Sequence, residues 1–361
     1  MSARTDDMRI ICVVLAVGCG VTVAACAGSG SGSSAPPAST HHGRRVSHHH
    51  PAGRADAKTA PTRRLRPVAL VTAEGENEVL AVSVPGGRVI HRVRLPASPT
   101  TVAAGSAGPA VVVSPQSGTV TLLSPRTLRP ETVLRSFRSP QIAAIAPGGN
   151  WALVSDAAAG SVSAVNLNTA QVADRVWVGL GAHHLAISPD GSTVWVALGE
   201  TARTIVTVDC SQMRHLRLTG RIHPPVAAHD LAFSPSGATV WVTSASEPYV
   251  SVLDAASGRR LAQIPAGTPP QHVVFGGPAA PHAYLASGYG STIEMVDPRS
   301  DRVVRRTPLP YGSFNLAVSG DVLVTTSLLD GHVTELDAAT LHRLIVRAVA
   351  PEARSVAIAN R

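Results

Sequence analysis

The sequence predicts an all-β protein, a seven-bladed β-propeller whose ring is closed by its C-terminal strand joining the N-terminal blade. Three observations indicate this fold: a β-rich segment that recurs about every 42 residues, four strand-like segments in each period, and no sustained apolar period of 3.6 residues. The clearest copies are His183–Ala197 and His229–Thr243. The β-rich segments open near Ala69, Val111, Leu153, Trp195, Trp241, Tyr284 and Leu323.

The amino terminus is predicted to be a signal peptide covering residues 1–25. Met1–Arg9 is polar, and the apolar run Ile10–Ala25 is shorter than the roughly 20 residues of a membrane span. The run ends in Val23-Ala24-Ala25-Cys26, which resembles the lipobox of bacterial lipoproteins. The resemblance implies that Cys26 is acylated and anchors the chain at the outer, extracytoplasmic face of the cell membrane. The alternative is ordinary cleavage after Ala25, without a lipid.

Residues 26–67 are predicted to be a disordered linker, because they are rich in Gly, Ser, Pro, Arg and His and poor in large apolar side chains. This linker carries about +6 of the net charge of +8, so the high pI of 10.1 does not describe the domain that follows. We therefore expect no nucleic-acid partner. The histidines at 41–42 and 48–50 could collect metal ions, or they could belong to a solvated basic tail.

The cysteines agree with an exported protein. Cys12 and Cys19 fall in the signal peptide and Cys26 in the lipobox, which leaves Cys210 as the one free thiol of the mature chain. A lone cysteine cannot form an internal disulfide. Because no His and Asn partners lie near it in sequence, we expect Cys210 to be an inert thiol rather than a nucleophile.

Residues 68–361 are predicted to form the propeller, with four short strands in each blade. Aromatic residues make up only 3% of the chain, so Val, Ala, Leu and Ile must build the core. The fourth segment of each period, such as Leu185-Ala186-Ile187, is apolar on both faces and small on one, as the crowded innermost strand requires. The chain begins with an outer strand at Val68 and ends with an inner one at Val356–Ala359. The last strand therefore completes the first blade and removes an exposed edge.

The repeats resemble a known family. Ser188-Pro189-Asp190-Gly191 followed by Val194-Trp195-Val196 is similar to the YVTN-repeat β-propellers, which are seven-bladed bacterial surface or periplasmic proteins. The resemblance spans Val68–Arg361, and the first, second and last copies depart from it. It implies a fold and not an activity, because propellers include lactonases, oxidoreductases and plain binding scaffolds.

The residues that lead into the inner strands are expected to surround one mouth of the central channel. Four of them occupy equivalent places in consecutive blades, and four others lie one step earlier. As a candidate ligand-binding site we assign His184, Asp230, His272 and Asn315, with His183, His229, Gln271 and Arg354. The connection before Ala228 would add His223 to this side. The acidic loop Glu74–Glu78 lies on the same face and is expected to be solvated.

Two interpretations of this mouth stay open. Clustered imidazoles and a carboxylate can bind a divalent metal as cofactor, with His184, His229, Asp230 and His272 as candidate ligands. Alternatively, the polar side chains cap strand ends and satisfy loop backbone groups.

The sequence favours a binding protein over an enzyme. It contains no Gly-x-Ser-x-Gly elbow, Walker loop, His-Glu-x-x-His or Cys-x-x-Cys-His motif. We expect a monomeric, membrane-anchored lipoprotein that binds a small molecule, peptide or cell-envelope protein at the channel mouth. The alternative functions are a lactonase-like hydrolase or metal-dependent enzyme that uses the His/Asp ring, and an interaction scaffold that uses its outer rim.

Overall fold

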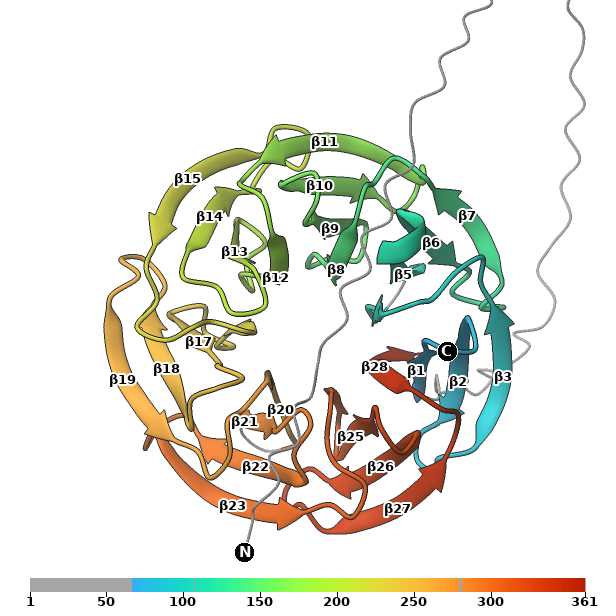
Figure 1. The fold of residues 1–361 in the computed structure, drawn as a ribbon, viewed down its shortest axis with the longest axis vertical. Coiled ribbons are helices and arrows are strands. Elements are labelled where there is room, and N and C mark those ends of the chain that lie inside the picture. The colour runs from blue at the N-terminus through green and yellow to red at the C-terminus, as the bar shows by residue number, and fades with distance from the viewer. Residues whose placement is uncertain (1–66, 107, 279–280, 361) are drawn as a thin grey trace, which may run out of the picture. The chain divides into compact units, whose positions relative to one another are not determined.

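Seven four-stranded antiparallel sheets are arranged in a ring around a central channel (Figure 1). The structure, a computed structural model, describes residues 67–106, 108–278 and 281–360. Within these ranges the one helical element is a 3-10 turn, η1 (Pro115–Ser117). The all-β class and the seven blades predicted from the repeats are thereby confirmed. The predicted signal peptide, the lipobox Cys26 and the linker lie outside the described residues.

Each sheet is one blade, with its strands following one another from the channel outwards. The blade closed by the terminus contains β28 (Ala353–Asn360), β1 (Pro67–Ala73), β2 (Glu78–Ser83) and β3 (Val89–Arg94). The next two contain β4 (Thr101–Ala103), β5 (Ala110–Ser114), β6 (Thr119–Leu123) and β7 (Pro130–Leu134), then β8 (Pro140–Ile145), β9 (Trp151–Asp156), β10 (Ser161–Asn166) and β11 (Gln171–Trp177).

The remaining four blades follow the same order. Two contain β12 (Ala182–Ile187), β13 (Thr193–Leu198), β14 (Ile205–Asp209) and β15 (Arg217–Ile222), then β16 (Leu231–Phe233), β17 (Thr239–Val242), β18 (Tyr249–Asp254) and β19 (Arg260–Pro265). The last two contain β20 (His272–Gly276), β21 (His282–Ala286), β22 (Thr292–Asp297) and β23 (Arg302–Pro308), then β24 (Leu316–Ser319), β25 (Val322–Ser327), β26 (His332–Asp337) and β27 (Arg343–Ala348).

The core lies between adjacent blades, where the middle strands are apolar on both faces. Trp195 on β13 and Trp241 on β17 occupy matching positions and are each 1% exposed. Each indole meets the edge of a phenylalanine on the inner strand of the next blade, with centroid distances of 6.1 Å to Phe233 and 5.2 Å to Phe275. These aromatic pairs tie one blade to the next, so the tryptophans serve packing.

The C-terminal strand closes the ring, as predicted. β28 pairs antiparallel with β1, from Pro67 opposite Asn360 to Ala73 opposite Ala353. β1 is the second strand of that blade, next to the inner one, rather than an outermost strand. The blade therefore contains both ends of the described chain, and no inner strand of the ring is left without a partner.

No helix within the described ranges is long and apolar enough to cross a membrane.

Candidate functional site at the channel mouth

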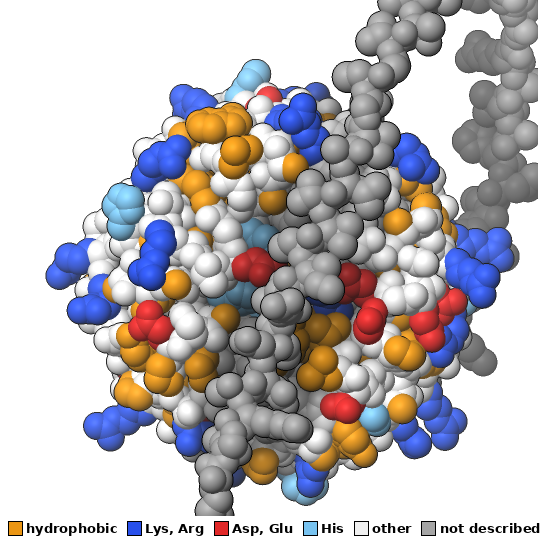
Figure 2. Space-filling model, viewed as in Figure 1, with side chains coloured by type: hydrophobic (Ala, Val, Ile, Leu, Met, Phe, Trp, Pro, Cys, Tyr) orange, Lys and Arg blue, Asp and Glu red, His pale blue; other side chains and the backbone are white. Residues whose placement is uncertain are grey.

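A cavity of about 320 Å³ opens at one mouth of the channel. Residues leading into the inner strand of all seven blades line it, because the antiparallel order brings these strand ends to one face. Figure 2 shows histidine side chains near the centre of the ring, with acidic side chains beside them. All eight residues assigned from the sequence are among the lining: His183, His184, His229, Asp230, Gln271, His272, Asn315 and Arg354.

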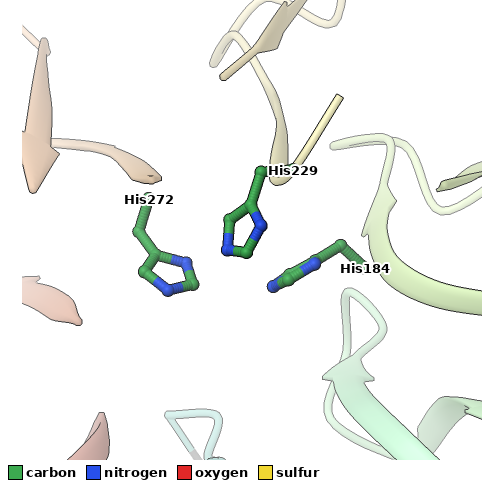
Figure 3. A group of neighbouring side chains, drawn as sticks. All are labelled: His184, His229 and His272. Atoms are coloured by element: carbon green, nitrogen blue, oxygen red, sulfur yellow. The ribbon is translucent and has the colours of Figure 1, made fainter. Parts of the chain in front are cut away.

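Three of the imidazoles converge from three consecutive blades (Figure 3). One ring nitrogen from each of His184, His229 and His272 lies within 4.8 Å of the others. The ring centroids are 4.5 Å apart for His184 and His229, 5.3 Å for His229 and His272, and 5.5 Å for His184 and His272. His184 and His272 are buried, and His229 is half-buried.

The three histidines reach this point from different backbone settings. His184 lies within β12, where the pairing with β13 shifts register between Ala182 and Leu185. His272 is a regularly paired residue at the start of β20. His229 precedes β16 and belongs to the loop before it. By position in the repeat, Asp230 is the equivalent of His184. In the blade of Asp230, however, the converging imidazole belongs to His229, the residue before it.

Asp230 is not one of the converging groups. Its Oδ1 accepts a hydrogen bond from the backbone N–H of Leu231 at 2.8 Å, and its Oδ2 accepts one from Val273 at 3.3 Å. The same Oδ2 lies 3.2 Å from Nδ1 of His272. The carboxylate thus satisfies backbone donors and orients an imidazole, which matches the strand-capping interpretation for this residue.

Asn315 also fits the strand-capping interpretation. Its side-chain Oδ1 accepts a hydrogen bond from the backbone N–H of Val356 at 3.4 Å, on the neighbouring inner strand β28. The mouth therefore contains two kinds of polar group: caps such as Asp230 and Asn315, and imidazoles that point into the cavity.

Glu200 determines which nitrogens of two histidines carry hydrogen. Its backbone carbonyl lies 2.9 Å from Nδ1 of His229, so that nitrogen must be the donor. Its carboxylate lies 3.5 Å from Nε2 of His183, which places the hydrogen of the His183 ring on Nε2. Nδ1 of His183 then accepts from Nδ1 of His184, 2.9 Å away. Glu200 lines the cavity as well, in the loop between β13 and β14.

Burial keeps the imidazoles of His184 and His229 neutral near pH 7. Loss of hydration, together with the neighbouring His183, His229 and His272 rings and Arg354, holds the pKa of His184 well below its usual value. Burial lowers the pKa of His229 to about 4. A hydrogen bond from His183 lowers the pKa of Glu200 to about 2, so this carboxylate is ionised.

Arg354 lies in the closing strand β28, and its charge is matched. Its Nη1 is 2.9 Å from a carboxylate oxygen of Glu74, and its guanidinium lies 5.4 Å from the centre of the Phe314 ring. The loop Glu74–Glu78 was expected to be solvated. Its two ends are not, because Glu74 pairs with Arg354 and the buried Glu78 pairs with Arg92.

Sequence reasoning missed Glu200 and Tyr289. Glu200 and Tyr289 line the cavity from loops between the second and third strands of their blades, which share the face of the mouth. The face shared by these loops and the mouth is the sequence signal that could have identified Glu200 and Tyr289. His223 lies in the connection between β15 and β16 on the expected side, with its Nδ1 3.3 Å from the carbonyl oxygen of Arg203, but it is exposed and does not line the cavity.

Cys210 lies outside the mouth. It is buried, its Sγ is 3.3 Å from the carbonyl oxygen of Gly191, and burial raises the pKa of the thiol to about 12. A thiol with so little thiolate is a poor nucleophile, as expected from the sequence.

Comparison with known proteins supports the fold and goes no further. No protein-family model and no curated protein matches the chain. A solved structure of a functionally unknown protein from Desulfotomaculum acetoxidans DSM 771 is similar, with a TM-score of 0.70 and 15% identity over 81% of this chain and 99% of that one. Dihydro-heme d1 dehydrogenase NirN in complex with DHE is also similar, with a TM-score of 0.60 and 16% identity over 82% and 67%.

Proposed function

We propose that this chain is an extracytoplasmic lipoprotein that binds a small ligand at the channel mouth. The observation that carries the proposal is the cavity of about 320 Å³, into which polar residues from every blade converge. Small-molecule sites in proteins are concave and combine apolar walls with a few polar groups. Here Phe314 and Tyr289 supply aromatic wall, and the histidines, Gln141 and Arg354 supply polar groups.

A cavity-filling variant tests this proposal. Gln141→Trp places an indole at the mouth, whereas Gln171→Trp places the same side chain on the exposed outer strand β11. Both proteins are screened for thermal shifts with a panel of small polar compounds. We expect stabilising compounds for the unaltered protein and for Gln171→Trp, and none of these shifts for Gln141→Trp. Shifts that persist in Gln141→Trp, or no shift in any protein, would contradict binding at the mouth.

The lipid anchor is supported by the lipobox, and the direction of β1 gives the face at which the linker joins the propeller. Ala73 pairs with Ala353, next to Arg354 at the mouth, while Pro67 begins the strand at its other end. The propeller therefore starts on the face away from the cavity. A linker that precedes Pro67 would therefore join the propeller on the face away from the mouth.

Metabolic labelling tests the anchor. Cells expressing the full chain should incorporate radiolabelled palmitate into it, and Cys26→Ala should release the protein from the membrane fraction. Absence of label, or membrane retention of Cys26→Ala, would contradict the lipoprotein proposal.

A second candidate function, a lactonase-like or metal-dependent hydrolase, is favoured by the three convergent imidazoles with Glu200 beside them. Hydrolysis of a panel of lactones with and without EDTA tests it. Activity that is lost in His184→Ala supports this function, and no hydrolysis under either condition contradicts it.

A further inference from the structure

We propose that the Nε2 atoms of His184, His229 and His272 bind one divalent transition-metal ion, with a coordination position left open towards the cavity. The proposal deepens the proposed function and rests on it, because the ion would occupy the same mouth.

The spacing of the three rings suits one ion. A nitrogen from each ring lies within 4.8 Å of the other two. Zinc–nitrogen bonds are about 2.0–2.1 Å long, so a tetrahedral ion holds its ligand nitrogens a little over 3 Å apart. Binding one ion therefore requires the rings to rotate about χ1 and χ2 until their nitrogens are closer together. Three protein ligands and one free position are typical of zinc sites that also bind a small molecule.

Within the described part of the chain, the polar contacts of the three rings are all made by Nδ1 and leave Nε2 without a partner. Nδ1 of His229 donates to the Glu200 carbonyl, Nδ1 of His272 faces the Asp230 carboxylate, and Nδ1 of His184 bonds to His183. Within the described residues no hydrogen bond reaches Nε2 of any of these three rings. Metal-binding histidines characteristically donate their other ring nitrogen to a carbonyl or carboxylate, which sets the tautomer. This arrangement leaves three Nε2 lone pairs for a ligand.

The charges of the mouth favour a cation. The Glu200 and Asp230 carboxylates lie against imidazoles, at 3.5 Å from His183 and 3.2 Å from His272. Among the described lining residues Arg354 is the one arginine or lysine, and Glu74 already pairs with it. Two carboxylates thus border the cluster of rings, and a divalent ion bound between the rings would lie near both. Imidazole ligands select zinc, copper, nickel or iron over magnesium and calcium.

Zinc and cobalt are the probes for the test. The full chain is used with its five linker histidines, 41–42 and 48–50, replaced by alanine, so that the linker does not compete for metal. After metal removal with a chelator, zinc is titrated by calorimetry and bound metal is counted by mass spectrometry. We expect one zinc per chain. Cobalt in the same protein should give the intense visible absorption of a four-coordinate ion.

Matched variants locate the ion. His229→Ala and His272→Ala should lose stoichiometric zinc, whereas His223→Ala, which removes an exposed imidazole from the same connection as His229, should keep it. Asp230→Asn should weaken zinc binding about 10–100-fold, as expected for loss of a group that orients a ligand. Circular dichroism melts of the metal-free proteins identify any variant that fails to fold, and the cobalt spectrum needs no substitution in the propeller.

The outcomes separate this inference from the proposed function. No zinc binding, a six-coordinate cobalt spectrum, or full zinc binding by folded His229→Ala and His272→Ala overturns the inference. If small compounds still stabilise the protein in a manner blocked by Gln141→Trp, the proposed function stands without the metal. If zinc does not bind and no compound stabilises the protein in a manner blocked by Gln141→Trp, both the inference and the proposed function are overturned.

Discussion

The carboxylate of Asp230 lies 3.2 Å from Nδ1 of His272, across the boundary between two neighbouring blades. The same carboxylate accepts hydrogen bonds from the backbone N–H groups of Leu231 and Val273. One side chain therefore joins the inner strands β16 and β20 and orients an imidazole that faces the cavity. The contact between the two blades and the orientation of His272 therefore both depend on the Asp230 carboxylate.

Asp230→Ala should lower the free energy of unfolding by about 1–3 kcal/mol, because backbone donors of Leu231 and Val273 lose their acceptor. Urea denaturation in the presence of EDTA measures the change without metal. Asp230→Asn keeps one side-chain oxygen and should lose less. An alanine variant as stable as the unaltered protein would contradict this role.

Acidification should destabilise the metal-free protein. Burial lowers the pKa of His229 to about 4 in the folded state, from 6.5 in the unfolded chain. Between these values the unfolded state binds more protons, so stability is present above pH 6.5 and is lost as the pH falls. From pH 7 to pH 5 this one residue should cost about 2 kcal/mol. His184 acts in the same direction.

Urea denaturation at pH 7, 6 and 5 in the presence of a chelator measures this dependence. His229→Asn cannot take up the proton, so its stability should fall less between pH 7 and pH 5. An equal fall in both proteins would show that His229 is not the group responsible.

Removal of Arg354–Arg361 should abolish cooperative folding. The deletion takes away all of β28 except Ala353, uncovers the apolar strand β1 and opens the ring. Arg354→Gln in the full chain is the control, since it removes the ion pair with Glu74 and keeps the strand. A truncated protein that is soluble and melts cooperatively would show that ring closure is dispensable.

Trp195→Ala should destabilise the protein by about 3–5 kcal/mol, because it leaves a cavity between two blades beside Phe233. Trp195→Phe should cost much less. The indole N–H has no hydrogen-bond partner within the described residues, so phenylalanine removes a buried donor as well as some volume. Chemical denaturation of both variants measures the difference, and Trp241→Ala provides the same change in the next blade. Losses below 1 kcal/mol for both alanine variants would contradict the packing role.

The architecture could be predicted because its signals are local. The alternation of Val194-Trp195-Val196, the turn Ser188–Gly191 and their recurrence each depend on a few neighbouring residues, and strand order then assigns a face to every connection. The same rule placed His183, His184 and Arg354 at one mouth. The same rule could have identified the loop residue Glu200, because the loop between β13 and β14 lies on the face of the mouth.

The sequence by itself determined the seven blades, the closing strand and which strand ends meet at the mouth. Only the tertiary structure decided which side chains meet. His229 and not Asp230 joins His184 and His272, because the inner strands begin at different residues and β12 shifts register at His184. A one-residue change in where a strand begins turns a side chain to another face, and distances across the channel depend on all seven blades together.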